Sequence, residues 1–152
     1  MSDISLESVI YRPPTLVEMP AIEALRYEVL DKPLGLRPGR LSESDTDPRA
    51  IHMAAFVDCQ VISTVRLDPE ADELYLVHRM ATHPEAQRRG IGRRVLNDAV
   101  AIAAIRGAKE ILLFSRVEST GFYEKLGYRQ VSRQVEYPDE DGIPNIRMKK
   151  RI

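Results

Sequence analysis

The sequence predicts an α/β fold in which one mixed sheet of about seven strands carries helices packed against it. Two observations predict it: short apolar runs bounded by turn residues are typical of strands, and longer segments repeat apolar residues at helical spacing. A run of strands is followed by a helix, a strand, a second helix and closing strands, which is an order typical of a mixed sheet. The 152 residues suit a single domain over residues 1–152 with one core of ordinary size.

The first third of the chain predicts a strand, a helix and a long loop. Residues 8–12 form the candidate first strand. Residues 16–30 predict a helix, because apolar side chains recur at helical spacing at Leu16, Met19, Ile22, Leu25 and Val29. Residues 31–50 are rich in Pro, Gly, Ser and Asp. They predict a loop, and a loop of this length in a small domain is typical of a lid or binding segment.

The middle of the chain predicts three strands. Residues 52–57 and 61–67 are apolar runs separated by Asp58-Cys59-Gln60, which predicts a hairpin. Residues 68–72 make another tight connection, and it leads into a strand over residues 73–81.

The last third predicts two helices around one strand, followed by a hairpin. The first helix presents an apolar stripe made of Ile91, Val95, Ala99, Ile102 and Ala103. It ends at Arg106-Gly107, where glycine is a typical residue just past a helix. Residues 110–115 predict a strand and residues 119–126 a second helix. Residues 128–137 and 143–151 predict the closing hairpin.

The composition argues against several partners. There are 22 Lys and Arg against 23 Asp and Glu, a formal net charge of −1, so no general attraction draws the chain to nucleic acid or an anionic membrane. No signal peptide is recognised, and the longest apolar stretch, residues 99–105, is too short to span a bilayer. The single cysteine, Cys59, excludes an internal disulfide and favours a reducing, cytoplasmic location. We expect no metal site, because His52 and His83 lack zinc-ligand spacing.

The segment Gln-Arg-Arg-Gly-Ile-Gly, residues 87–92, is the most informative for function. It opens a helix, and a glycine loop at a helix N-terminus presents unpaired N–H groups and a positive dipole end to an anion. Gly90 and Gly92 remove side chains that would block close approach, and the flanking arginines add positive charge. The segment therefore predicts a site for a cofactor that carries a diphosphate.

Three kinds of phosphate-binding loop compete for this segment. A Walker A loop is excluded, because the chain lacks Gly, four residues and then Gly-Lys-Ser/Thr. A dinucleotide-binding loop fits poorly, because Val95 stands at the third glycine and residues 82–87 separate the strand from the loop, although Glu110 lies near the place of the ribose-binding acid. The pattern Q/R-x-x-G-x-G/A, after a strand and a proline turn, fits without a gap.

Residues 79–92 resemble the coenzyme A motif of the GNAT superfamily of N-acetyltransferases, and Phe122-Tyr-Glu-Lys-Leu-Gly-Tyr128 resembles the "F-Y-E-K-L-G-F" segment of the same family. Two motifs in the right order are more specific than either alone. The resemblance implies a sheet splayed in the middle with helices on both faces. It implies acetyl-CoA as donor, bound by residues 74–128, and a primary amine of a small molecule or peptide as acceptor, near residues 31–50.

The resemblance also implies which residues contact the donor. The diphosphate would be held by the loop backbone, at Gln87, Arg88, Arg89, Gly90, Ile91 and Gly92. The pantetheine arm would pair with the strand end at Met80, Ala81 and Thr82. An N–H near Met80 could also hold the oxyanion that develops on the thioester. Arg116 could bind the cofactor or cap the sheet edge.

Two residues are candidates for the chemistry. Tyr123 matches the family's tyrosine that protonates the departing thiolate, and a phenol of pKa about 10 can do so when held at the sulfur. The alternative is a half-buried aromatic residue whose hydroxyl is satisfied in the fold. His78 is a candidate general base, because a histidine pKa near 6.5 suits the task. Its rivals are a purely structural histidine, Glu73, Tyr75 and water.

Several points stay open at this stage. The tail from Gly142 to Met148 resembles a "G-I-P-H-x-x-M" ending of some family members, with Asn145 in place of the histidine. A non-catalytic acyl-CoA-binding or regulatory module and a transferase for a longer acyl-CoA are the alternatives to an acetyltransferase. Monomer and homodimer are both compatible with the sequence.

Overall fold

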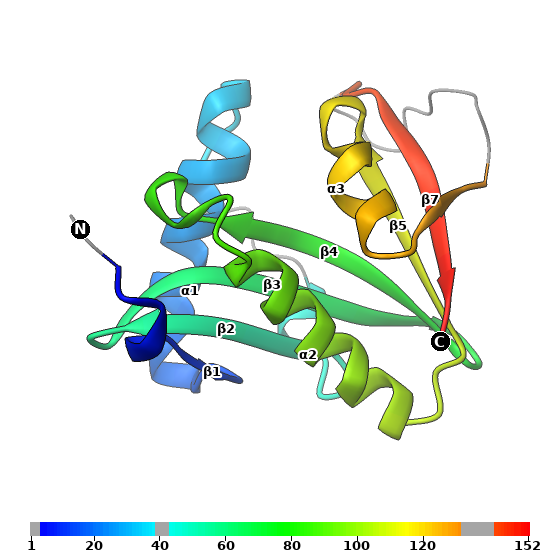
Figure 1. Cartoon of the computed structure of the whole chain (residues 1–152), viewed down its shortest axis with the longest axis horizontal. Coiled ribbons are helices and arrows are strands. Elements are labelled where there is room, and N and C mark those ends of the chain that lie inside the picture. The colour runs from blue at the N-terminus through cyan, green and yellow to red at the C-terminus, as the bar shows by residue number, and fades with distance from the viewer. Residues whose placement is uncertain (1–3, 39–42, 132–141) are drawn as a thin grey trace.

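The computed structural model describes residues 4–38, 43–131 and 142–152. A seven-stranded sheet runs through them in the order β1-β2-β3-β4-β5-β7-β6 (Figure 1). All neighbours are antiparallel except β4 and β5, which are parallel, so the predicted mixed sheet is confirmed. The strands are β1 Ile10–Arg12, β2 Ile51–Val57, β3 Gln60–Ala71, β4 Leu74–Thr82, β5 Glu110–Arg116, β6 Arg129–Gln130 and β7 Asn145–Arg151.

Three α-helices accompany the sheet, at α1 Met19–Arg26, α2 Ile91–Ile105 and α3 Thr120–Lys125. The helix predicted over residues 16–30 is continuous in space but not uniform. It starts with a 3-10 turn at Leu16–Glu18, and after α1 it continues as a π-helical turn at Tyr27–Asp31. Further 3-10 turns lie at Leu6–Ser8, Lys32–Leu34, Glu43–Thr46, Pro84–Ala86 and Val117–Ser119.

Helices α1 and α2 cover opposite faces of the sheet (Figure 1). Strand β2 shows why: Met53 and Ala55 pack in the larger core with α2, whereas Ala54 and Phe56 pack with Ile22 of α1. Successive side chains of a strand point to opposite faces, so one apolar strand can serve both cores. The helices on both faces that the family resemblance implied are confirmed.

The sheet splays between β4 and β5. These two strands pair only where Leu74–Leu76 lie beside Glu110–Leu112. Beyond that point β5 stays paired with β7 along its whole length, while the rest of β4 stays with β3. The far end of β4 and the far end of β5 therefore diverge, as Figure 1 shows, and the backbone edges that face the gap have no strand partner in the described part of the chain.

Several predicted boundaries change. The strand predicted at residues 8–12 is shorter, because Leu6–Ser8 form a 3-10 turn. The predicted hairpin at Asp58-Cys59 is confirmed: both residues have positive φ, at 48° and 64°, as a tight two-residue turn requires. In the closing hairpin β6 spans Arg129–Gln130, and the predicted strand continues into residues 132–137, outside the described residues.

Candidate active site

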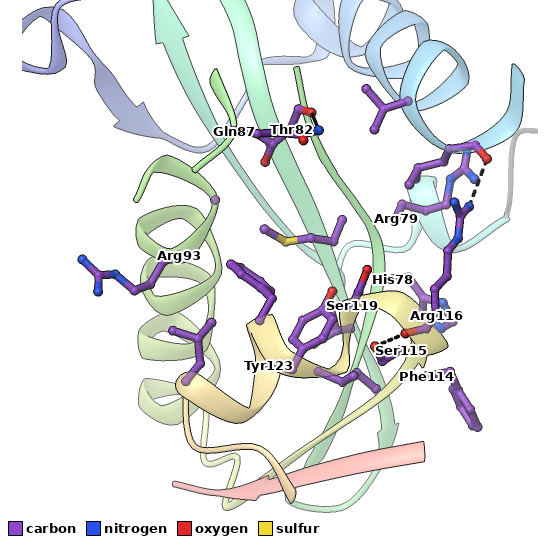
Figure 2. A pocket seen from close by; sticks show the side chains of 18 of the residues that line it. His78, Arg79, Thr82, Gln87, Arg93, Phe114, Ser115, Arg116, Ser119 and Tyr123 are labelled. Carbon is purple, nitrogen blue, oxygen red and sulfur yellow. Dashed lines mark hydrogen bonds between the residues drawn. The ribbon is translucent and has the colours of Figure 1, made fainter. Parts of the chain in front are cut away.

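A cavity of about 1060 Å³ lies at the splay. Its walls come from β4, the loop before α2, β5, α3 and the start of β7, so both diverging strands and both sequence motifs contribute (Figure 2). The volume is that of a site for a ligand of cofactor size. The fold thus brings the two motifs, which lie 30 residues apart in the sequence, to one cavity.

Strand β4 carries one extra residue where it borders this cavity. In the register of the two strands, Arg79 and Met80 oppose the single residue Val65 of β3, which is a β-bulge. Arg79 has φ +54°, a conformation that costs energy for a residue with a side chain. No residue pattern predicts this bulge, since arginine is not a residue that favours positive φ.

The bulge decides which face each side chain of β4 reaches. His78 and Arg79 follow one another in the chain, yet both point to the α1 face, where they meet Asp68 and Asp31. Met80 returns to the α2 face and packs against its core. We call the half of the cavity at Met80 and the glycine loop the donor side, and the half at His78 and Arg79 the acceptor side.

The donor side is built by the start of α2. Gly90 is the residue before the helix and has φ +81°, which glycine adopts without strain. Among the described residues the N–H groups of Arg88, Arg89 and Gly90 have no backbone partner, and the first N–H groups of any helix lack one. The Gln87 side chain donates to the Thr82 carbonyl at 3.0 Å and so closes the turn. The loop therefore offers several unpaired N–H donors at a positive helix end.

Gly92 packs closely against strand β4. A Cβ atom at Gly92 would stand 3.0 Å from Thr82 Oγ1 and 3.3 Å from Met80 Cε, so the space is already filled by β4. Glycine there lets α2 approach the strand closely. At Gly90 a Cβ would meet only the end of Arg93 at 3.6 Å, so φ is the reason for that glycine.

The remaining predicted donor residues divide into three groups. The first group lines the cavity and consists of Met80, Thr82, Gln87, Arg88, Gly90, Gly92 and Arg116. Arg89 also lines it, but its guanidinium donates to the Ile4 carbonyl and is tied to the N-terminal segment. Ile91 and Ala81 are buried in the two cores and do not line the cavity, so any donor contact would use their backbone.

Tyr123 lies on α3 between the two sides (Figure 2). Its neighbour Phe122 faces Gly92, while the charge nearest its hydroxyl is that of Arg116. Burial raises the pKa of Tyr123 to about 12, and Arg116 acts in the opposite direction. The phenol is thus protonated at neutral pH. Among the described residues its hydroxyl has no hydrogen-bond partner, in contrast to the alternative of a satisfied structural tyrosine.

The acceptor side is held together by contacts between distant segments. The Arg79 guanidinium forms two parallel hydrogen bonds with the Asp31 carboxylate, at 2.9 and 2.7 Å. Arg116 donates to the Leu30 carbonyl at 3.0 Å. Both arginines therefore fix the end of the α1 segment against the splay, and Figure 2 shows their side chains on the same side of the cavity.

His78 lines the cavity with Asp68 behind it. Its Nε2 lies 3.6 Å from Asp68 Oδ2, and Asp68 is itself paired with Arg66 at 3.0 Å. Burial lowers the pKa of His78 below its ordinary value; Asp68 opposes this shift and the charge of Arg66 adds to it. The imidazole is therefore neutral at pH 7 and able to accept a proton. The rivals Glu73 and Tyr75 do not line the cavity.

Sequence reasoning missed the carboxylates of this side, Asp31, Asp45 and Asp68. Asp45 Oδ1 accepts from Arg26 at 2.9 Å and from Arg66 at 2.8 Å. It therefore fastens residues 43–46 of the predicted substrate-side loop to the sheet. Burial tends to raise the pKa of Asp45, but the two arginines outweigh it and leave that pKa lowered. No local pattern marks Asp31 and Asp45, because their partners lie 19 to 48 residues away. Asp68 pairs with the nearby Arg66, but its proximity to His78 depends on the pairing of β3 with β4.

Two general findings bear on the type of site. In residues 4–38, 43–131 and 142–152 no group of three or more His, Cys, Asp and Glu is arranged to hold a metal ion. None of the helices in these residues is long and apolar enough to cross a membrane.

The chain matches the family model described as "Acetyltransferase (GNAT) domain" over residues 48–130. It is similar to an uncharacterized N-acetyltransferase of Methanocaldococcus jannaschii, with 33% identity over 76 residues. That match covers 48% of this chain and 32% of the relative, so the matched region is about a third of the relative's length.

Two solved structures have the same fold. An acyl-CoA N-acyltransferase from Pseudomonas aeruginosa superimposes with a TM-score of 0.77 and 23% identity, covering 93% of this chain and 97% of the other. The PaiA N-acetyltransferase from Thermoplasma acidophilum, solved in complex with coenzyme A, gives a TM-score of 0.72 and 19% identity, with 95% and 99% covered. The similarity extends over almost the whole chain, including the segments outside the family model.

Proposed function

The chain belongs to the GNAT acetyltransferase family, and from this premise we propose that it transfers an acetyl group from acetyl-CoA to a primary amine of a small molecule or peptide. One observation carries the proposal: a protonated, buried tyrosine hydroxyl stands in the cavity between the glycine loop and a neutral histidine. A site that only bound a cofactor would not need that arrangement.

The donor side supplies the binding energy for acetyl-CoA. The unpaired N–H groups before α2 and the arginines beside them match a diphosphate in charge and in hydrogen bonding. The edge of β4 beyond Leu76 has no β5 partner, so its backbone groups are free to pair with the amides of the pantetheine arm. The coenzyme A complex of the Thermoplasma acidophilum relative supports this role for the fold.

The reaction requires one bond to form, one to break and two protons to move. The amine nitrogen attacks the thioester carbon, the new N–C bond forms, and the C–S bond breaks. His78, directly or through a water molecule, takes the proton that the amine loses. Tyr123 gives its hydroxyl proton to the departing thiolate, whose thiol has a pKa near 8.5 as a reference. The backbone N–H groups near Met80 are the candidates for holding the oxyanion.

The proposal is tested by thiol release. Purified protein is mixed with acetyl-CoA and a broad panel of amines and peptides, and free coenzyme A thiol is measured. We expect acetyl-CoA to raise the melting temperature and at least one amine class to release thiol. Tyr123→Phe should lower turnover by about 100-fold or more and leave the acetyl-CoA dissociation constant unchanged, because it removes the acid and not the donor contacts.

Tyr128→Phe is the matched control for this experiment. Tyr128 stacks edge-to-face on Tyr123 and is equally buried, but it does not line the cavity, so its turnover should stay within about 2-fold of the parent. Stabilisation by acetyl-CoA without thiol release for any amine would support the alternative of a non-catalytic acyl-CoA-binding module. Competition between acetyl-CoA and longer acyl-CoAs distinguishes the transferase for a longer acyl chain.

A further inference from the structure

The cavity is lined by six cationic side chains and, among the described residues, by no Asp or Glu. The cations are Arg79, Arg88, Arg89, Arg93, Arg116 and Lys125. Those near the glycine loop match the phosphates of the donor. Arg79 and Arg116 lie on the acceptor side, away from that loop, so the donor phosphates do not account for them.

These two arginines differ in how their charge is balanced. The Asp31 carboxylate, itself 95% buried, neutralises Arg79 through two hydrogen bonds. Among the described residues the Arg116 guanidinium has one hydrogen-bond partner, the Leu30 carbonyl, which carries no net charge. In the described part of the chain no carboxylate pairs with Arg116, so its remaining N–H groups and its positive charge are available. A planar guanidinium binds a carboxylate through two parallel hydrogen bonds.

Asn145 adds an independent observation beside Arg116. The two residues are direct cross-strand partners of β5 and β7, and both line the cavity. Asn145 is only 7% exposed, yet no hydrogen bond within the described residues reaches its Oδ1. A buried carbonyl oxygen without a donor is costly, which points to a ligand that supplies an N–H.

We propose that the acceptor is an amine that also carries a carboxylate a few bonds away, as in an amino acid. The carboxylate binds the Arg116 guanidinium and an N–H of the acceptor donates to Asn145 Oδ1. This proposal rests on the proposed function, because it names the substrate class for the same site. Polycationic amines are disfavoured, because the charged side chains that line the cavity among the described residues are all cations and repel every further positive charge of the acceptor.

The test compares matched acceptors by kcat/KM for thiol release. Each set holds an amino acid, its methyl ester or amide, and the decarboxylated amine. We expect the carboxylate form to be preferred on the order of 100-fold, because the analogues leave buried polar groups unpaired. Arg116→Met should abolish the preference and Arg116→Lys should keep part of it. Asn145→Asp should reverse it, because the new carboxylate neutralises Arg116 and repels that of the substrate.

The readout is the ratio of kcat/KM between the carboxylate form and its analogues. Loss of the Arg116 charge also acts on Tyr123, but this effect lowers turnover equally for all acceptors and leaves the ratio unchanged. Arg106→Met, at the far end of α2, is the matched control and should keep the preference. Equal kcat/KM for all three forms, or a preference that survives both Arg116→Met and Asn145→Asp, would overturn the inference while the proposed function stands. No acetyl-CoA binding and no thiol release with any amine would instead overturn the proposed function itself.

Discussion

The donor side and the acceptor side of the cavity are built in different ways. The donor side comes largely from one continuous segment, residues 80–93, where a strand ends and a helix begins. The acceptor side is assembled from the π-helical turn after α1 and from strands β3, β4, β5 and β7, joined by contacts that span up to 86 residues of sequence. The anion site is thus a local property of the backbone, whereas the proposed acceptor site depends on tertiary ion pairs.

The stabilising interactions differ in the same way. A helix start needs no partner segment to present its N–H groups, and φ at Gly90 is a local choice. The acceptor side depends on buried charge pairs, and removing one partner of such a pair leaves an uncompensated charge. Substitutions should therefore affect stability on the acceptor side and donor affinity on the donor side.

The largest effect is expected for Asp31→Asn. Asp31 is almost fully buried and Arg79 is about three-quarters buried, so the variant leaves a guanidinium without its counter-charge. We expect a loss of about 2–3 kcal/mol in the free energy of unfolding, at the lower end for buried pairs because Arg79 keeps some solvent contact. Denaturant unfolding measures the loss, and calorimetric titration should show an acetyl-CoA dissociation constant within about 3-fold of the parent.

Asp98→Asn is the control for that variant. Asp98 pairs with Arg94 on the exposed face of α2, with the two side chains 31% and 58% exposed. The loss there should be at most about 0.5 kcal/mol. A loss of about 100-fold in acetyl-CoA affinity in Asp31→Asn would contradict the prediction. The acceptor side and the donor side would then depend on the same contacts.

The same contrast explains what could be predicted from the sequence. The mixed sheet, the hairpin at Asp58-Cys59 and the glycine loop all follow from patterns within a few residues. The bulge at Arg79 could not be predicted, because its φ is imposed by the Asp31 pair and by the register with β3, not by residue preference. The close packing of Gly92 could not be predicted for a similar reason, since its neighbours Thr82 and Met80 become adjacent only when α2 packs on β4.

A middle-sized effect is expected for Gly92→Ala on the donor side. The new Cβ would press on Thr82, whose hydroxyl is held 2.8 Å from Ser63 Oγ, so the start of α2 must move away from β4. We expect acetyl-CoA to bind about 10-fold more weakly and the protein to lose about 1 kcal/mol of stability. Isothermal titration and thermal melting measure these two quantities.

Gly121→Ala is the matched control, because Gly121 also lies in a helix and a Cβ there would meet nothing within 4 Å. Alanine should be neutral or stabilising by up to about 1 kcal/mol at that position. Unchanged acetyl-CoA affinity in Gly92→Ala would contradict the prediction. It would mean that the loop binds the donor independently of the packing of α2 on β4.

The smallest effect concerns the pH dependence of the acceptor side. The groups that act on His78 are Asp68 and Glu70, which raise its pKa, and Arg66 and Arg79, which lower it, while burial lowers it most. Because the pKa is lowered, the acid limb of kcat/KM should lie below pH 6.5, the ordinary value for histidine. Asp68→Asn removes the main group that raises the pKa of His78, so the limb should move to lower pH. The move should be small, because water screens this partly exposed pair.

Two variants decide whether this limb belongs to His78. His78→Gln should remove it, whereas His52→Gln should leave it in place, because His52 is also a histidine of lowered pKa but does not line the cavity. Movement of the limb to higher pH in Asp68→Asn would contradict the sign of the Asp68 contribution. A limb that persists in His78→Gln would assign proton removal to water or another group, and His78 would then only help to shape the acceptor side.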